Sequence, residues 1–269
     1  MLCFSEIKLN QKLMDYTLTA LQMAAAGGHS VLMLGPHGSG QTMLSRRVPG
    51  ILPTPTDEEL AQIRAVYEEG NVEPPSGRPF RAPHHTISVP GFRVEWERAR
   101  GGVLLVDELD LFRADVKGFF LNLMDGRTED DPLVIATMSR CRCNYRGSVK
   151  HTCRCYRDDI VKYRDHNASL RAAFDIVLYM DDSTPTNCSY EPPTSKELRR
   201  VIEQPNEFPA EHRESGAVQA LWALERACGT SHFERVEKLA LTVARLRRGY
   251  PPMLTGGDVA LAVAYANKG

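Results

Sequence analysis

The segment from Ser30 to Thr42, SVLMLGPHGSGQT, constrains the fold of this chain more than any other. Its apolar run from Val31 to Leu34 is typical of a buried parallel strand, and the glycine-rich loop behind it leads into a helix-like run. A strand, a glycine-rich loop and a helix N-terminus in this order form a phosphate-binding loop, G-x-x-x-x-G-K-S/T. The sequence therefore predicts an α/β P-loop fold with a parallel sheet.

Six loop residues are the predicted nucleotide ligands: Gly35, Gly38, Ser39, Gly40, Gln41 and Thr42. Backbone N–H groups beside the glycines can face phosphate oxygens, and Thr42 stands where the pattern has a hydroxyl that binds Mg²⁺. The pattern requires a lysine where Gln41 stands. A glutamine amide donates a neutral hydrogen bond without charge, so we expect weaker ATP binding and a larger loss of hydrolysis. The alternative is an ordinary glycine turn.

A second apolar run, Gly102 to Val106, ends in Asp107 and Glu108. Ligands of open α/β sheets bind at the carboxyl ends of the strands. In a P-loop protein the first acid holds Mg²⁺ and the second positions or activates the attacking water. We therefore predict Asp107 and Glu108 as catalytic residues, with Thr42 and Asp107 as the Mg²⁺ ligands. The alternative is a strand that simply ends in acids.

The remaining pattern predicts two domains. Apolar runs at 133–137 and 174–180 complete the sheet, and helices are expected over 11–26, 42–48, 57 onward and 111–124. A turn-rich stretch follows residue 180, then a capping box at 194–197 and helices over 214–228, 231–248 and 255–267. We predict an α/β nucleotide-binding domain at 1–183, with a cysteine-rich insert at 139–165, and a linker with a helical lid at 184–269.

Four of the seven cysteines form two C-x-C pairs separated by nine residues: Cys141, Cys143, Cys153 and Cys155. No export signal is visible at the N-terminus, so we expect a reducing, cytoplasmic location in which clustered cysteines favour metal over disulfides. Four thiolates suit tetrahedral Zn²⁺, although C-x₂-C is the commoner spacing. Four thiols without a metal are the alternative.

The segment 140–164 is also the one local basic patch, with eight lysines and arginines and interleaved Tyr145, Tyr156 and Tyr163. The formal net charge of -1 gives the whole chain no general attraction to nucleic acid or membrane. Any contact with DNA is therefore expected through this patch, and a solvated basic face is the alternative. No apolar run approaches the ~20 residues that cross a bilayer, so we expect no membrane contact.

Several stretches resemble the Mg-chelatase-like AAA+ family in its ComM-type branch. They are AAAGGHSVLMLGPHGSGQTMLSRRVPGILP, RPFRAPHHTIS, GGVLLVDEL with FRADV, CRCNYRG followed by CRC, and TSKELRRV. The resemblance implies an αβα sandwich with a helical lid, ATP and Mg²⁺ as cofactors, and a role in DNA processing. It also implies a ring of identical subunits or an assembly with a paralogous AAA+ subunit.

The chain departs from that family at its catalytic positions. Gln41 replaces the lysine, Ser139 stands at the position of a sensor asparagine, and Ala173 at that of an arginine finger. The nearest arginine, Arg171, is out of register, and the lid arginine falls near Ser231. Two expected pore insertions and the N-terminal Lon-like domain are also missing. The resemblance therefore implies a regulatory or structural subunit that no longer hydrolyses ATP efficiently.

Two other functions are compatible with the sequence. One is a working ATPase in DNA processing, in which a partner supplies the finger or a nearby cation such as Arg46 or Arg81 replaces the lysine. The other is a zinc-stabilised DNA-binding module with a vestigial nucleotide site.

Overall fold

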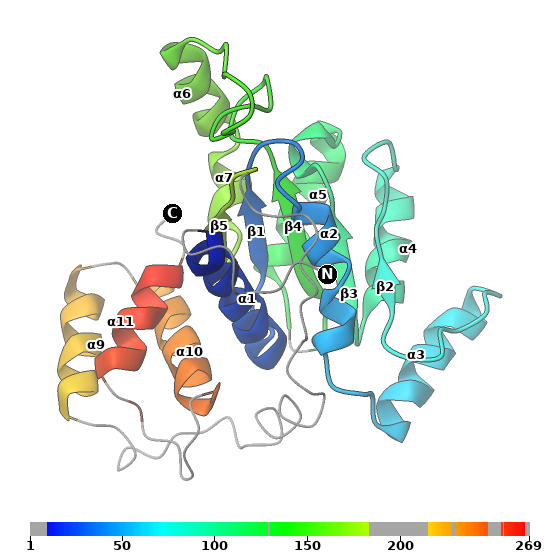
Figure 1. The fold of residues 1–269 in the computed structure, drawn as a ribbon. Coiled ribbons are helices and arrows are strands. Elements are labelled where there is room, and N and C mark those ends of the chain that lie inside the picture. Colours follow the sequence, from blue (N-terminus) through cyan, green and yellow to red (C-terminus); the bar gives the residue numbers. More distant parts are fainter. Residues whose placement is uncertain are drawn as a thin grey trace.

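A parallel five-stranded sheet forms the centre of the protein, with strand order β2-β3-β4-β1-β5 (Figure 1). The computed structural model describes residues 10–128, 130–182, 215–227, 230–246, 254 and 256–266. The strands are β1 (Val31–Leu34), β2 (Phe80–Arg81), β3 (Val103–Val106), β4 (Leu133–Met138) and β5 (Ile176–Tyr179), and all their pairings are parallel. The predicted parallel α/β architecture is confirmed.

The three central strands are apolar along almost their whole length because both faces of the sheet are covered. Every residue of β1, β3 and β4 is buried. Strands buried on both faces read as continuous rather than alternating apolar runs. Because all strands are parallel, the carboxyl ends of β1, β3 and β4 lie at the same edge of the sheet. This brings the loop after β1 close to Asp107 and Glu108, which follow β3.

Helices pack on both faces of this sheet. In the described residues they are α1 (Asn10–Gly27), α2 (Gln41–Ser45), α3 (Asp57–Glu69), α4 (Val89–Ala99), α5 (Ala114–Asp125), α6 (Arg157–His166), α7 (Ala168–Ala172), α9 (Ser215–Ala227), α10 (Thr230–Leu246) and α11 (Gly256–Tyr265). One core cluster joins one face of the sheet to α1 and α9–α11, and the other joins the opposite face to α4, α5 and α7.

The three C-terminal helices pack directly on the α/β body. Figure 1 shows α10 beside α1, and the buried side chains of α9, α10 and α11 share a core cluster with Ile176 and Leu178 of β5. The His29 ring also bonds the Thr242 hydroxyl at 2.8 Å. The predicted C-terminal helices are confirmed, while the division into two domains near residue 183 stays a prediction.

Three helices were not predicted, for different reasons. In α4, Pro90 and Gly91 look like a turn, yet Ser88 caps the helix and a proline in the first turn costs no hydrogen bond. The helix α6 has no buried residue, so no apolar periodicity marks it, and the five-residue α7 is too short to show one.

Some predicted boundaries were also wrong. The helix expected over 42–48 ends at Ser45, and a 3-10 turn (Val48–Ile51) with Pro49 in its first turn follows. The helix expected over 111–124 begins at Ala114, after a 3-10 turn (Leu109–Leu111). Residues 80 and 81 form the edge strand β2 in a region expected to be loop and turn. The helix predicted from Thr194 lies outside the described residues.

Candidate functional site

The glycine-rich loop between β1 and α2 has the backbone that phosphate binding requires. Gly38 and Gly40 adopt left-handed φ angles of 83° and 84°, which side chains rarely tolerate. A Cβ on Gly35 would lie 2.8 Å from both Gln41 Nε2 and Ser39 Oγ, so the loop leaves room only for glycine there. The structure thus brings the predicted ligands together in one tight turn at the carboxyl edge of the sheet.

Ser39 is the polar group of this loop that lacks a partner. Its side chain is 2% exposed, and its hydroxyl oxygen has no hydrogen bond within the described part of the chain. A buried hydroxyl without a partner costs free energy, about 1–3 kcal/mol in mutational series. An oxygen-rich ligand in the loop would satisfy it, so the loop fits a phosphate group.

The side chain in the lysine position is bound to the protein itself. Gln41 is partly buried, and its Nε2 donates a hydrogen bond to the carbonyl oxygen of Met33 in β1, at 3.2 Å. A ligand phosphate would have to compete with this bond for the amide. Even if the amide left Met33 to bind a phosphate, it would bring no positive charge to that phosphate.

The two predicted Mg²⁺ ligands, Thr42 and Asp107, lie in contact, and Thr137 joins them; these three residues are called the Mg²⁺ corner below. The Thr42 hydroxyl donates to the Asp107 carboxylate, 3.1 and 3.0 Å from its two oxygens. The Thr137 hydroxyl donates to Asp107 Oδ1 at 2.5 Å and accepts from the backbone N–H of Glu108 at 2.9 Å. This donor set of hydroxyl and carboxylate oxygens suits a hard cation such as Mg²⁺.

Thr137 was missed as a site residue. It was assigned only to a buried strand, although it is a polar residue near the end of an apolar run. A buried hydroxyl in such a strand needs a hydrogen-bond partner, and that was the available signal. Its partner is the carboxylate of Asp107, which the sequence had already predicted as a site residue.

Glu108 follows β3 in a strained backbone. Its φ of 53° lies in the left-handed region, which a glutamate seldom adopts. Its side chain is exposed and makes no hydrogen bond or ion pair within the described residues. The turn therefore presents an unpaired carboxylate next to the Mg²⁺ corner.

Two arginines considered as substitutes for the missing lysine differ in their environment. Arg81 forms a two-pronged ion pair with Glu95, with distances of 2.6 and 2.7 Å. Arg46 follows α2 directly and is exposed. Of the two, only Arg81 has an ion pair among the described residues, so Arg46 keeps its charge available.

Ser139 at the sensor position, and Arg171 two residues before the finger position at Ala173, both have structural partners. The carbonyl of Ser139 accepts a hydrogen bond from the Tyr163 hydroxyl at 3.3 Å. Arg171 donates to the Tyr179 hydroxyl at 2.8 Å. Ser231 lies in α10, and its side chain is outside the described part.

The four clustered cysteines converge on one point. All four sulfurs lie within 4.8 Å of one another, and the pairs Cys141–Cys143, Cys141–Cys153 and Cys143–Cys153 are 3.4, 3.7 and 3.5 Å apart. Four sulfurs held tetrahedrally at about 2.3 Å from one ion lie about 3.8 Å apart. Cys141, Cys143, Cys153 and Cys155 therefore form a cluster that can hold a metal ion.

The thiols of this cluster differ in their pKa. Burial opposes ionisation of Cys143, but backbone N–H groups of Tyr145 and Arg154 lower its pKa to about 6. Burial raises the pKa of Cys155 to about 12. Because neighbouring thiolates repel one another, the four can ionise together only around a cation.

Residues 139–156, the cysteine loop between β4 and α6, are hydrogen-bonded to the phosphate-binding loop. The backbone N–H of His37 donates to the carbonyl of Asn144 at 3.1 Å. At its other side the loop is held by Asp182, which accepts from the Ser148 hydroxyl and the Val149 N–H, both at 2.5 Å. A change in the cysteine loop can thus reach the nucleotide loop through one hydrogen bond.

The basic segment 140–164 occupies this loop and α6. Tyr156 is 81% exposed and Tyr145 is 39% exposed. Tyr163 instead packs inward and donates to Asp110 at 2.7 Å, and burial raises its pKa far above the ordinary range. Two of the three tyrosines are available to a ligand.

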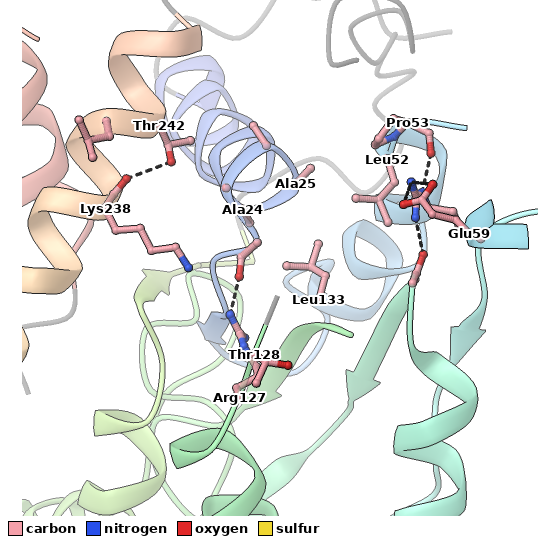
Figure 2. Close-up of a pocket in the computed structure, with 17 residues that line it drawn as sticks. Ala24, Ala25, Leu52, Pro53, Glu59, Arg127, Thr128, Leu133, Lys238 and Thr242 are labelled. Carbon is pink, nitrogen blue, oxygen red and sulfur yellow. Dashed lines mark hydrogen bonds and ion pairs between the residues drawn. The ribbon is translucent and has the colours of Figure 1, made fainter. Parts of the chain in front are cut away.

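Another cavity, of about 590 Å³, lies at the opposite edge of the sheet, near the amino ends of β1, β3 and β4. Its two arginines bond to groups of the protein itself, as the dashed lines in Figure 2 show. Arg127 donates to the carbonyl of Gly28, and Arg78 pairs with Glu59 at 3.0 Å while donating to Pro53 and Gly101 carbonyls. We assign it no ligand.

No helix among the described residues is long and apolar enough to cross a membrane.

Comparisons with known proteins find similar sequences for part of the chain. Residues 10–123 match the family described as magnesium chelatase, subunit ChlI. The chain is 42% identical over 109 residues to the competence protein ComM of Haemophilus influenzae and 40% identical over 105 residues to the uncharacterized protein YifB of Escherichia coli. These matches cover 36% and 34% of this chain and 21% of each relative. The chain thus spans about a fifth of the length of these relatives.

A solved structure of a candidate ATPase from Cytophaga hutchinsonii has a similar fold. The TM-score is 0.51, with 95% of this chain and 81% of that chain covered, at 13% sequence identity. At this identity the likeness concerns the fold alone. Together with the parallel sheet it confirms the predicted P-loop α/β fold.

Proposed function

We propose that this protein, whose residues 10–123 match the magnesium chelatase family, is a ComM-type nucleotide-binding module that binds Mg-ATP weakly and hydrolyses it poorly. One observation carries the proposal. Gln41, in the lysine position, gives its amide hydrogen bond to Met33, while Thr42 and Asp107 keep the pairing of a Mg²⁺ corner.

The loop would hold the phosphate chain. Its backbone N–H groups and the unpartnered hydroxyl of Ser39 would meet phosphate oxygens, and Thr42 with Asp107 would hold Mg²⁺. Bound Mg²⁺ supplies positive charge to the phosphate oxygens. Glu108, exposed and unpaired, would orient the attacking water.

Hydrolysis suffers more than binding because charge develops on the phosphoryl group as it is transferred. A neutral amide at Gln41 offers little there, and Ser139 and Ala173 replace the family's sensor and finger. We therefore propose a regulatory or structural subunit in a ring of identical chains or with a paralogous AAA+ subunit. An active ATPase would need a partner's arginine or Arg46.

Titration with a fluorescent ATP analogue and Mg²⁺ tests the proposal. Wild type should bind weakly, and Gln41→Lys should bind more tightly without a large gain in turnover, because the sensor and finger stay absent. Wild-type turnover that rises with protein concentration would instead establish the active ATPase.

A second candidate function is DNA binding by a zinc-stabilised surface. The sulfur separations of 3.4–3.7 Å in the cysteine cluster support a bound Zn²⁺, and the loop exposes Arg142 and Arg154. A reducing cytoplasm, in which the thiols stay available to metal, is the compartment that this function requires.

Binding to labelled DNA over a series of salt concentrations tests this candidate. Affinity should fall steeply with salt, and the Arg142→Gln, Arg154→Gln double variant should bind more weakly on every sequence. A salt-independent affinity, or no loss in the double variant, would exclude contact through these residues.

A further inference from the structure

Five arginines surround a second cavity, at the carboxyl edge of the sheet beside β4 and β5. They come from four parts of the chain: Arg140 after β4, Arg146 in the cysteine loop, Arg157 and Arg164 in α6, and Arg171 in α7. The cavity holds about 390 Å³, and Tyr179 of β5 lies at its wall. None of the described residues that line it is an aspartate or glutamate.

Three arginines of this pocket, Arg146, Arg157 and Arg164, have at most a weak ion pair within the described residues. Arg146 and Arg157 make no ion pair within the described residues. Arg164 pairs with its neighbour Asp165 at 3.1 Å, but the two side chains are 59% and 61% exposed, and such pairs contribute little. Arg140 lies over the ring of Tyr179, 5.3 Å from its centroid.

Two carboxylates near the pocket are hydrogen-bonded to other groups. Asp110 accepts the hydroxyl of Tyr163 at 2.7 Å. Asp182 is held by Ser148 and Val149, which lie on the cysteine loop. Like charges gathered around one cavity repel one another, so the pocket is stabilised by an anion that enters it.

We propose that the arginine pocket binds a phosphate-ester anion, at a site separate from the glycine-rich loop. Guanidinium groups present paired N–H donors that match phosphate oxygens, and arginine is the residue type for that recognition. The volume of about 390 Å³ is at the small end of ligand pockets and suits one phosphorylated unit.

Two sources can supply this chemistry: a free polyphosphate, or the backbone of a single-stranded nucleic acid. The surroundings favour the nucleic acid. Tyr179 is 51% exposed, so the ring face that Arg140 leaves open can stack a base. Arg142, Arg154 and Lys162, on the same loop and helix as the pocket arginines, are also exposed. In this form the inference rests on the proposed DNA-binding function and names the site that would carry it.

The test uses a fluorescein-labelled oligothymidylate, with inorganic tripolyphosphate as competitor. The pocket variant is Arg146→Gln with Arg157→Gln, both exposed residues whose loss leaves the core intact. The control, Arg64→Gln with Arg113→Gln, removes the same charge from exposed positions outside the pocket. Unchanged circular dichroism and melting temperature verify folding.

The pocket variant and the control both also carry Gly38→Asp, which blocks phosphate binding at the glycine-rich loop, so that only binding at the pocket is compared. An aspartate tolerates the left-handed φ of 83° better than most residues, and nothing lies within 4 Å of its Cβ. Its carboxylate repels phosphate from the loop. Nucleotide binding at the loop, tested by Gln41→Lys, can therefore fail without affecting this result.

We expect the pocket variant to bind the oligonucleotide at least about tenfold more weakly than the control, and the slope of log affinity against log salt to fall by about two. Displacement by tripolyphosphate would show that free polyphosphate enters the same pocket, and failure to displace would assign the pocket to the nucleic-acid backbone. Equal affinities of pocket variant and control, or no binding by wild type, would overturn the proposal.

Discussion

The side-chain amide of Gln41 donates a hydrogen bond to the backbone carbonyl of Met33, 3.2 Å away in the strand that precedes the loop. The residue in the position of the catalytic lysine thus serves the local fold. Its neighbour Thr42 is meanwhile bound to Asp107, as a Mg²⁺ corner requires. One part of the nucleotide site is preserved and the next residue has lost its charge.

Replacing Gln41 by lysine should strengthen binding of a Mg-nucleotide by about tenfold, because a charged donor makes a hydrogen bond about twice as strong as a neutral one. Gln41→Met is the matched control: it keeps the length of the side chain and removes the donor, so it should bind no better than wild type. Fluorescence titration measures both. Equal affinities of Gln41→Lys and Gln41→Met would show that this position does not meet the phosphates.

Asp107→Asn should abolish the Mg²⁺ dependence of nucleotide binding. The variant keeps the size of the side chain and can still accept one hydrogen bond from Thr42, but it loses the charge that attracts the cation. Titration with and without Mg²⁺ gives the comparison. Glu108→Gln is the control, since it should lower turnover while Mg²⁺ still promotes binding. Persistent Mg²⁺ dependence in Asp107→Asn would place the metal elsewhere.

The central strands and the loop were predictable because burial on both faces leaves a plain signal. Residues 31–34, 103–106 and 133–138 are unbroken or nearly unbroken apolar runs. Asp107 and Glu108 follow one of them directly, so parallel pairing alone brings them to the edge where the glycine-rich loop lies.

Other features depend on contacts that no local pattern records. The role of Thr137 appears only once β3 and β4 lie side by side. The bond from Gln41 to Met33 depends on the rotamer of one side chain. The helix α6 has no buried residue to mark it in the sequence, and its position decides which arginines meet Arg140 and Arg171 around one pocket.

Stability should fall at acid pH through Asp175. Burial opposes ionisation of this carboxylate, but His29, Arg127 and the Ser30 N–H and hydroxyl outweigh burial and lower its pKa. The carboxylate therefore contributes stability above the unfolded pKa of about 3.9, and this is lost as the pH falls through the lower folded pKa. Thermal melting at pH 7 and below pH ~4 measures it.

Asp175→Asn isolates this contribution. The variant loses a charged acceptor that receives two bonds from Ser30, each 2.8 Å, and lies beside Arg127. We expect a loss of about 2 kcal/mol at neutral pH and a smaller acid dependence. Asp165→Asn, on an exposed side chain, is the control and should change neither. An Asp175→Asn variant with the acid dependence of wild type would assign that dependence to other groups.

Removing metal should destabilise the chain and disturb the nucleotide loop together. Protein purified without chelator should contain about one Zn²⁺ per chain, and Cys153→Ser should contain much less, because a structural site uses four ligands. Cys3→Ser, outside the cluster, should keep the metal. Without the ion, four adjacent thiols no longer hold the loop whose Asn144 carbonyl accepts the N–H of His37. Chelation should therefore lower both the melting temperature and nucleotide affinity in wild type and in Cys3→Ser. Metal-free wild type that melts at the same temperature would rule out a structural ion at this cluster.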